Sequence, residues 1–120
     1  MAKKILVIDD EPDILKLAII RLEASGYEVL MAEDSEEALE KLKTTVPDLI
    51  LLDLLLPKMQ GDVLCKKIKS DPELKHIPII IFTASAIRVP AKVGEMGADD
   101  YIVKPFEPDN LLFKIKKFIG

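Results

Sequence analysis

The chain has 120 residues, of which 49% are hydrophobic and 32% are charged, and its formal net charge is −4. These values predict one globular domain over residues 1–120, exclude an intrinsically disordered chain, and argue against direct binding of nucleic acid. Cys65 is the single cysteine, so no internal disulfide bond can form. No apolar run reaches the ~20 residues of a membrane span or resembles a signal peptide. We therefore expect a cytoplasmic protein that does not bind membranes.

Five apolar runs predict β-strands, in chain order at residues 5–8, 27–31, 49–52, 77–82 and 100–103. The first, third and fourth runs are apolar without alternation. This pattern is typical of parallel strands that are covered on both faces. We therefore expect a buried parallel sheet.

Between the strands, apolar residues recur at helical spacing in four sets: Ile14, Leu15, Ala18 and Leu22; Ala38, Leu39 and Leu42; Val63, Leu64 and Ile68; and Leu111, Leu112, Ile115 and Phe118. Gly26 is predicted to end the first helix, and the capping and acidic residues 34–37 to begin the second. A further helix is predicted between residues 86 and 96, where Pro90 and Gly94 make the helical pattern weakest.

The alternation of strand and helix predicts an α/β fold with helices on both faces of a parallel sheet. Right-handed crossovers leave few topologies, and the flavodoxin-like order 2-1-3-4-5 suits a three-layer, doubly wound sheet of five strands. In such a sheet, ligands bind beyond the carboxyl ends of the strands, where the strand order reverses between the first and third strands.

Polar or small residues follow four of the predicted strands: Asp9 and Asp10 after the first, Asp53 after the third, Thr83 and Ala84 after the fourth, and Lys104 after the fifth. Two carboxylates about 4 Å apart repel each other by about 4 kcal/mol at an effective dielectric constant of ~20, so three of them require a cation. Mg²⁺ is suited to this role, because it prefers carboxylate oxygens and a phosphate. Lys104 supplies a positive charge for an anion, Thr83 a hydroxyl group, and Ala84 a backbone N–H that a ligand can approach.

Several of these residues would also serve ordinary structural roles. Asp9 and Asp10 would serve equally as a helix cap, and Lys104 alone as a solvated loop charge. Asp53 is different, because it interrupts the apolar run at residues 49–56, where an uncompensated charge is costly. The joint placement at four strand ends favours one functional site over separate structural roles.

Other polar residues are expected to be structural. Cys65 is predicted to be a small residue on a helix face, and His76 has no second histidine with which to bind a metal. Two groups of lysines are expected to be solvated, with a partner surface as the alternative for the second group: Lys66, Lys67 and Lys69, and Lys114, Lys116 and Lys117.

Four segments, in chain order, form one pattern: ILVIDDEP at residues 5–12, PDLILLDLLLPKMQG at 47–61, IIIFTA at 79–84 and GADDYIVKPF at 97–106. With this pattern, the chain from Lys4 to Ile119 resembles the receiver domain of two-component response regulators, the family of the chemotaxis regulator. The resemblance implies the flavodoxin-like receiver fold over the whole chain.

The resemblance also implies a phosphoacceptor. Asp53 would take a phosphoryl group from a phosphohistidine on a sensor histidine kinase or a histidine phosphotransfer protein. Asp10, Asp53 and the backbone carbonyl of Leu55 would ligate Mg²⁺ directly, and Asp9 would act mainly through water. Phosphoryl transfer depends on positioning and charge neutralisation, which a metal and a lysine supply.

The residues around the phosphoryl group follow from the same resemblance. Thr83 and the Ala84 N–H would hold phosphoryl oxygens, Lys104 would pair with the phosphate, and Tyr101 matches the switch aromatic of the family. The domain would not be an enzyme beyond assisting its own phosphorylation. Slow autodephosphorylation is expected, because Leu55 flanks the approach of water and cannot orient it.

Other functions fit the residues less well. A flavodoxin-like electron carrier would need a phosphate-cradling loop where the acidic residues 9–13 stand, and a phosphatase of the haloacid-dehalogenase type would need an acid at Leu55. A pseudo-receiver, which docks partners without phosphorylation, is the alternative function, and its mark would be the loss of an acid or of the lysine. A stand-alone regulator and a receiver from a longer regulator or hybrid kinase both stay open, as does the downstream target.

Overall fold

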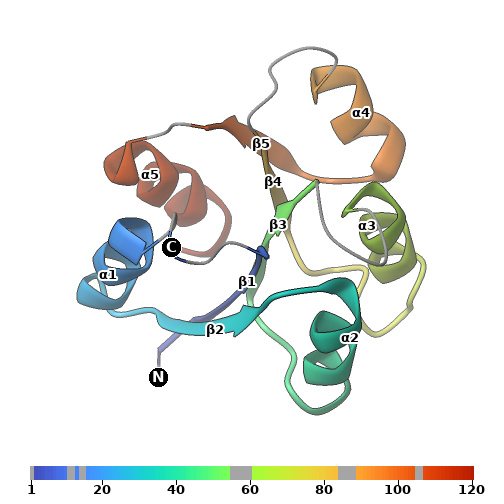
Figure 1. Cartoon of the computed structure of the whole chain (residues 1–120), viewed down its shortest axis with the longest axis horizontal. Coiled ribbons are helices and arrows are strands. Elements are labelled where there is room, and N and C mark those ends of the chain that lie inside the picture. Colours follow the sequence, from blue (N-terminus) through green and yellow to red (C-terminus); the bar gives the residue numbers. More distant parts are fainter. Residues whose placement is uncertain (1, 11–12, 14–15, 55–60, 84–88, 105–106) are drawn as a thin grey trace.

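The computed structural model describes residues 2–10, 13, 16–54, 61–83, 89–104 and 107–120, with the backbone alone for residues 89–92. Strands and helices alternate along the described chain: β1 (Lys4–Ile8), α1 (Lys16–Ala24), β2 (Glu28–Ala32), α2 (Ser35–Thr44), β3 (Leu49–Asp53), α3 (Gly61–Lys69), β4 (Ile79–Thr83), α4 (Val89–Met96), β5 (Asp100–Val103) and α5 (Pro108–Ile119). Figure 1 shows α1 and α5 on one face of the central sheet and α2, α3 and α4 on the other. The predicted three-layer α/β architecture is confirmed.

The sheet is parallel throughout and has the strand order β2-β1-β3-β4-β5, which confirms the predicted order. Ile8 at the end of β1 pairs with Leu52 of β3, and Thr83 at the end of β4 pairs with Val103 of β5. Because these pairs all lie at carboxyl ends, the register brings the residues that follow the strands to one edge of the sheet.

Each face of the sheet has its own hydrophobic core. Ile50 and Ile81 belong to the core on the side of α2, α3 and α4, whereas Leu51 and Phe82 belong to the core on the side of α1 and α5. Every residue of β3 and β4 is buried, which explains why their sequences lack alternation. The carboxyl edge at which the candidate site is expected therefore includes the ends of the two most buried strands of the described chain.

Two strands start later than predicted, and local hydrogen bonds explain the difference. The Ile77 N–H donates to the Leu74 carbonyl at 3.0 Å, so Ile77 closes the turn before β4 instead of starting the strand. The Tyr27 N–H likewise donates to the Leu22 carbonyl at 3.1 Å, so Tyr27 belongs to the turn after α1 and not to β2. Both side chains are buried. Because buried residues outside a strand are as apolar as those within it, the apolar pattern placed Tyr27 and Ile77 in the predicted strands.

The helices agree with the predictions at most positions. The Asp34 carboxylate accepts a hydrogen bond from the Glu37 N–H at 2.7 Å and caps α2 as predicted. Pro90 is the second residue of α4, where its missing N–H removes no helical hydrogen bond.

Val63 lies in α3 as predicted but faces solvent, and two other predicted helical positions lie outside the described residues. Val63 is 51% exposed and lies away from the core, because the buried face of α3 carries Leu64, Cys65 and Ile68 instead. Ile14 and Leu15 fall in the part of the chain that the structure does not describe.

Among the described residues, no helix is both long and apolar enough to cross a membrane.

Candidate functional site

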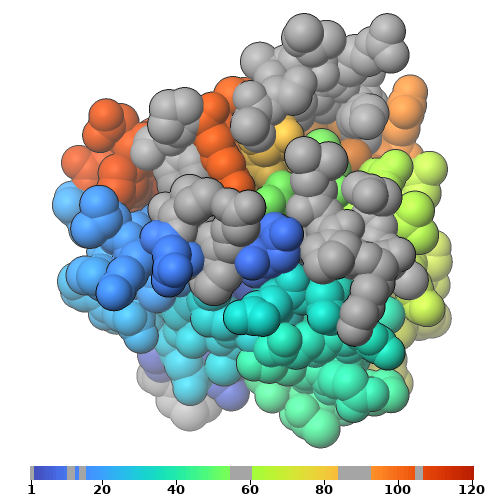
Figure 2. All heavy atoms as spheres, viewed as in Figure 1, coloured from blue at the N-terminus to red at the C-terminus, as the bar shows by residue number. Residues whose placement is uncertain are grey.

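Three aspartates converge at the carboxyl edge of the sheet. Asp9 directly follows β1, Asp10 comes next, and Asp53 is the last residue of β3. One carboxylate oxygen from each lies within 4.8 Å of the others. Asp9 is 1% exposed and Asp53 is 7% exposed, whereas Asp10 is open to solvent. In Figure 2 the atoms that follow β1, in dark blue, lie close to those at the end of β3, in green. The cluster therefore has two buried acids and one that faces outward.

Lys104 lies among the buried acids. Its Nζ is 3.5 Å from Asp9 Oδ2 and 3.4 Å from Asp53 Oδ2, and it sits 4.6 Å from the centre of the Phe82 ring. The Lys104 backbone N–H donates to the Thr83 carbonyl at 2.7 Å, which fixes the residue at the end of β5. Three carboxylates and one ammonium group leave the site with a net negative charge, so it retains capacity for a cation.

The chemistry of the donor set fits Mg²⁺. Carboxylate oxygens are hard ligands, and this ion is commonly held by one or two carboxylates together with water and a phosphate. The exposed Asp10 leaves the cluster accessible from solvent, while burial of Asp9 and Asp53 raises the cost of leaving their charges uncompensated. The residues present therefore suit a hard divalent cation.

Thr83 and Tyr101 lie on the neighbouring strands β4 and β5. Thr83 is the last residue of β4 and is buried, and Tyr101 is the second residue of β5 and is partly buried against the core beneath α4. Residue pairs Ile81–Tyr101 and Thr83–Val103 are adjacent in the sheet register. The side-chain positions predicted to hold and sense a phosphoryl group thus lie two register steps apart. The other positions predicted from the resemblance, Leu55 and Ala84, lie outside the described residues.

Gly61 supports the site in a way that the sequence analysis missed. A Cβ atom at this position would lie 2.3 Å from the Asp53 carbonyl oxygen and 2.7 Å from the Leu54 Cα. The Gly61 N–H also donates to the Leu54 carbonyl at 2.9 Å. Only glycine lets the start of α3 approach the end of β3 this closely. A glycine eight residues after a candidate acceptor was the available signal, but spacing alone does not reveal the close approach.

Gly61→Ala is expected to destabilise the fold by about 1–3 kcal/mol, because the methyl group overlaps backbone atoms that cannot move without displacing Asp53. Urea unfolding measures the free energy. Gly94→Ala is the matched control, since a Cβ atom there meets nothing within 4 Å. That control should stabilise α4 by up to about 1 kcal/mol through helix propensity. Equal effects of the two substitutions would contradict the steric argument.

Two lysines expected to be solvated are instead held by specific partners, and the prediction was wrong for both. Lys114 Nζ is 3.1 Å from Asp100 Oδ1 and donates to the Tyr101 carbonyl at 2.9 Å. Its ammonium group also lies 5.5 Å from the centre of the Tyr101 ring. Lys69 Nζ likewise donates to the backbone carbonyls of Lys75 and Ile77 and to the carboxylate of Asp99. Lys66, Lys67, Lys116 and Lys117 are exposed as expected.

Cys65 lies on a helix face, as predicted, and the structure shows that it is buried. Its thiol donates to the Met96 carbonyl oxygen at a sulfur–oxygen distance of 3.5 Å. Burial raises the pKa of the Cys65 thiol to about 11; the positive charge of Lys69 lowers this pKa by a smaller amount, and the negative charges of Asp99 and Asp62 raise it slightly further. The thiol is therefore neutral near pH 7, and its position beneath α4 is structural rather than reactive.

Comparison with known families identifies one match over nearly the whole chain. Residues 5–116 match the family described as the response regulator receiver domain. A curated relative is 44% identical over 120 residues, the alkaline phosphatase synthesis transcriptional regulatory protein PhoP of Bacillus subtilis (strain 168), covering 99% of this chain and 49% of that protein. The phosphate regulon transcriptional regulatory protein PhoB of Pseudomonas aeruginosa is 42% identical over 117 residues, covering 97% of this chain and 51% of that protein. The chain thus spans about half the length of these curated relatives.

Solved structures agree with this match. A putative response regulator from Chloroflexus aurantiacus J-10-fl superposes with a TM-score of 0.94 at 35% identity, covering 99% of this chain and 98% of that one. The chemotaxis response regulator CheY4 of Vibrio cholerae superposes with a TM-score of 0.90 at 30% identity, covering 98% of this chain and 99% of that one. This chain therefore shares its fold with these two solved chains over nearly their whole length.

Proposed function

The chain belongs to the response regulator receiver domain family, and on this premise we propose that Asp53 is its phosphoacceptor, charged from a phosphohistidine on a sensor histidine kinase or a histidine phosphotransfer protein. The observation that carries the proposal is the contact of Lys104 with both Asp9 and Asp53, 3.5 and 3.4 Å away, inside a cluster of three acids. A structural ion pair needs one acid, whereas phosphoryl transfer needs an acceptor, a metal site and a cation for the phosphate.

In the proposed reaction, a carboxylate oxygen of Asp53 attacks phosphorus in line with the departing imidazole nitrogen. A bond between oxygen and phosphorus forms, and the bond between phosphorus and nitrogen breaks with its electron pair going to the imidazole. Burial of Asp53 within a fully buried strand holds the nucleophile in one orientation. Lys104 offsets negative charge on the phosphoryl oxygens as the donor leaves.

Magnesium would be held by Asp10 and Asp53, with Leu55 contributing a carbonyl and Asp9 acting through water. When bound, the ion supplies charge neutralisation for the phosphoryl oxygens. Lys104 contacts Asp9 and Asp53 in the described site, so the lysine offsets part of their repulsion. These residues bind and orient, and no side chain needs to change its covalent state except Asp53.

Thr83 and Tyr101 would convert phosphorylation into a change of surface. The Thr83 side chain would move toward the phosphoryl group, where its hydroxyl and the Ala84 N–H would bind phosphoryl oxygens. The Tyr101 ring would then occupy the space that the Thr83 side chain leaves. A phosphoryl group shifts this equilibrium only if Thr83 and Lys104 bind it better in one of two conformations. The partner that reads the surface, and a cytoplasmic location, are part of the proposal.

The test is incubation of the protein with acetyl phosphate, followed by intact-mass measurement. With Mg²⁺ present, we expect a mass increase of one phosphoryl group, and with excess EDTA we expect none. A pseudo-receiver would gain no phosphoryl group in either condition. The complete set of acids and the lysine favours the phosphoacceptor over that alternative.

Asp10→Ala is expected to weaken Mg²⁺ binding by at least about tenfold, because a hard cation loses a direct carboxylate ligand. Isothermal titration with Mg²⁺ measures the change. Asp13→Ala is the matched control, an exposed acid three residues later in the chain. Unchanged Mg²⁺ affinity in Asp10→Ala would mean that the acid pair at residues 9–10 is only a helix cap.

A phosphate mimic is expected to move Tyr101 but not Tyr27. These are the two tyrosines of the chain, so labelling with fluorotyrosine gives one ¹⁹F resonance for each. Tyr27 is buried in the core beneath α1 and α5 and acts as an internal reference, while Tyr101 contacts the opposite core. Beryllofluoride with Mg²⁺ should shift only the Tyr101 resonance. A spectrum in which neither resonance moves would contradict the switch.

A further inference from the structure

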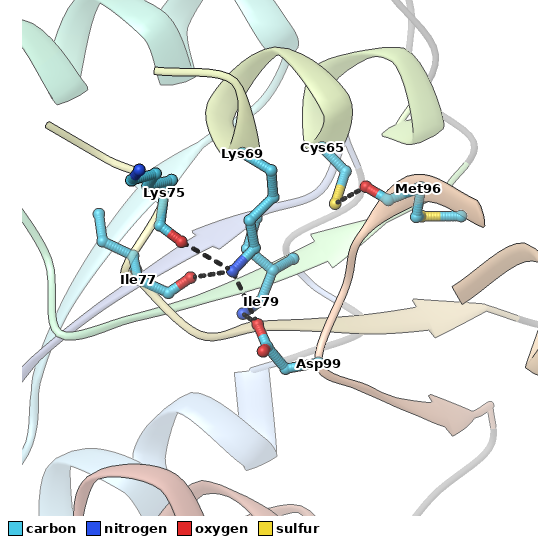
Figure 3. Close-up of polar contacts among 7 residues, drawn as sticks. All are labelled: Cys65, Lys69, Lys75, Ile77, Ile79, Met96 and Asp99. Atoms are coloured by element: carbon cyan, nitrogen blue, oxygen red, sulfur yellow. Dashed lines mark hydrogen bonds and ion pairs between the residues drawn. The ribbon is translucent and has the colours of Figure 1, made fainter. Parts of the chain in front are cut away.

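A second polar cluster lies at the edge of the sheet opposite the acids, and it joins α3, β4 and the turn before β5 (Figure 3). Lys69, the last residue of α3, donates from Nζ to the Ile77 carbonyl at 2.8 Å and to the Lys75 carbonyl at 3.2 Å. It also pairs with Asp99 Oδ2 at 2.9 Å. An ammonium group has three N–H donors, so these partners use all of them. The Lys69 side chain is only 18% exposed and is a fixed part of the fold.

Asp99 connects this lysine to the start of β4. Its Oδ2 also accepts a hydrogen bond from the Ile79 N–H at 2.9 Å, and the Asp99 N–H donates to the Ile79 carbonyl at 2.9 Å. Ile79 is the first residue of β4, and Asp99 immediately precedes β5. The aspartate therefore sets where these two parallel strands begin relative to each other.

The end of α4 is held at the same place. The Cys65 thiol donates to the carbonyl of Met96, the last residue of α4, and the Ala98 N–H donates to the Val93 carbonyl at 3.0 Å. Gly97 has a φ of +81°, and a Cβ atom there would lie 3.5 Å from Lys69 Cγ. The stem of Lys69 thus packs along the turn that leads from α4 to Asp99.

We propose that Lys69 and Asp99 are positioning residues that anchor the start of β4, the end of α4 and the start of β5 as one fixed body. Thr83 lies at the free end of β4, and Tyr101 is two residues after Asp99. With the far end anchored, a displacement of Thr83 cannot be absorbed by sliding of β4 against β5, and it is transmitted to Tyr101 instead. This inference rests on the proposed phosphoacceptor function.

The anchor predicts a loss of coupling rather than a loss of ligand binding. Lys69 and Asp99 lie at the opposite edge of the sheet from Asp53, so their removal leaves the acids and Lys104 in place. Coupling between two sites is the free energy by which one site biases the other, and it falls when the element between them can move independently. The affinity for a phosphate mimic and the response of Tyr101 should therefore separate.

The experiment measures both quantities by ¹⁹F NMR of the fluorotyrosine-labelled chain during titration with beryllofluoride and Mg²⁺. For Lys69→Met we expect an apparent affinity within about threefold of the wild type, and a Tyr101 shift at saturation reduced by at least half. Asp99→Asn should have the same effect while keeping an oxygen for the Ile79 N–H, and it serves if Lys69→Met fails to fold. Lys69→Arg should restore the response, because it keeps the positive charge and several donors.

Lys67→Met is the matched control, an exposed lysine on the same helix, and it should respond like the wild type. A full Tyr101 shift in both Lys69→Met and Asp99→Asn would overturn the inference, as would an equal loss in Lys67→Met. Absence of any Tyr101 shift in the wild type would instead contradict the proposed switch, and absence of phosphoryl uptake from acetyl phosphate by the wild type would overturn the phosphoacceptor function, so these failures are distinguishable from failure of the anchor.

Discussion

Asp53→Asn is expected to abolish phosphoryl uptake from acetyl phosphate while the protein stays folded. The carboxylate oxygen of Asp53 is the group that attacks phosphorus, and the amide oxygen that replaces it is uncharged and a poor nucleophile. Asn has nearly the shape of Asp, so the packing of β3, in which all five residues are buried, is retained. Intact-mass measurement should show one added phosphoryl group in the wild type and none in the variant.

Asp48→Asn is the matched control for this result. Asp48 precedes the same strand at its opposite end, and its carboxylate accepts a hydrogen bond from the Lys4 N–H at 2.7 Å, which an Asn oxygen also accepts. This variant should be phosphorylated like the wild type. Full phosphorylation of Asp53→Asn, or loss of phosphorylation in Asp48→Asn alone, would assign the acceptor elsewhere.

The fold was predictable because its signals are local and repeated. Parallel strands buried on both faces require continuous apolar runs, and β1, β3 and β4 contain them. The strand limits were less predictable, because Tyr27 and Ile77 are buried without belonging to the sheet. Burial determines the apolar pattern of the sequence, whereas backbone hydrogen bonds determine where a strand begins and ends. The apolar pattern can be seen in the sequence, but the hydrogen bonds cannot.

The acidic site was predictable for a topological reason. Strand ends of a parallel sheet meet at one edge, so Asp9, Asp53 and Lys104 could be brought together without any knowledge of distances. Lys69 and Lys114 were not predictable in this way. Each lies on a helix among exposed lysines of the same type, and only the three-dimensional position of Asp99 or Asp100 distinguishes it from them.

Lys104→Met is expected to destabilise the metal-free protein by about 3 kcal/mol, because it leaves buried carboxylates without their cation. Asp9 is 1% exposed and lies 3.5 Å from the Lys104 ammonium group, so solvent cannot replace the lysine. Urea unfolding in EDTA measures the change in free energy. Lys117→Met is the control, since this lysine is exposed and its removal should alter stability by less than about 0.5 kcal/mol.

The sign of the effect depends on which charge is removed, and this makes the prediction specific to electrostatics. Adding Asp53→Asn to Lys104→Met removes one of the mutually repelling acids, so the double variant should recover part of the lost stability in EDTA. Saturating Mg²⁺ should also raise the stability of Lys104→Met, by about 2.7 kcal/mol at one hundred times its dissociation constant, because the ion binds only the folded chain. If Lys104→Met is as stable as the wild type in EDTA, or if the double variant is no more stable than Lys104→Met, then the lysine does not offset the charge of the acid cluster.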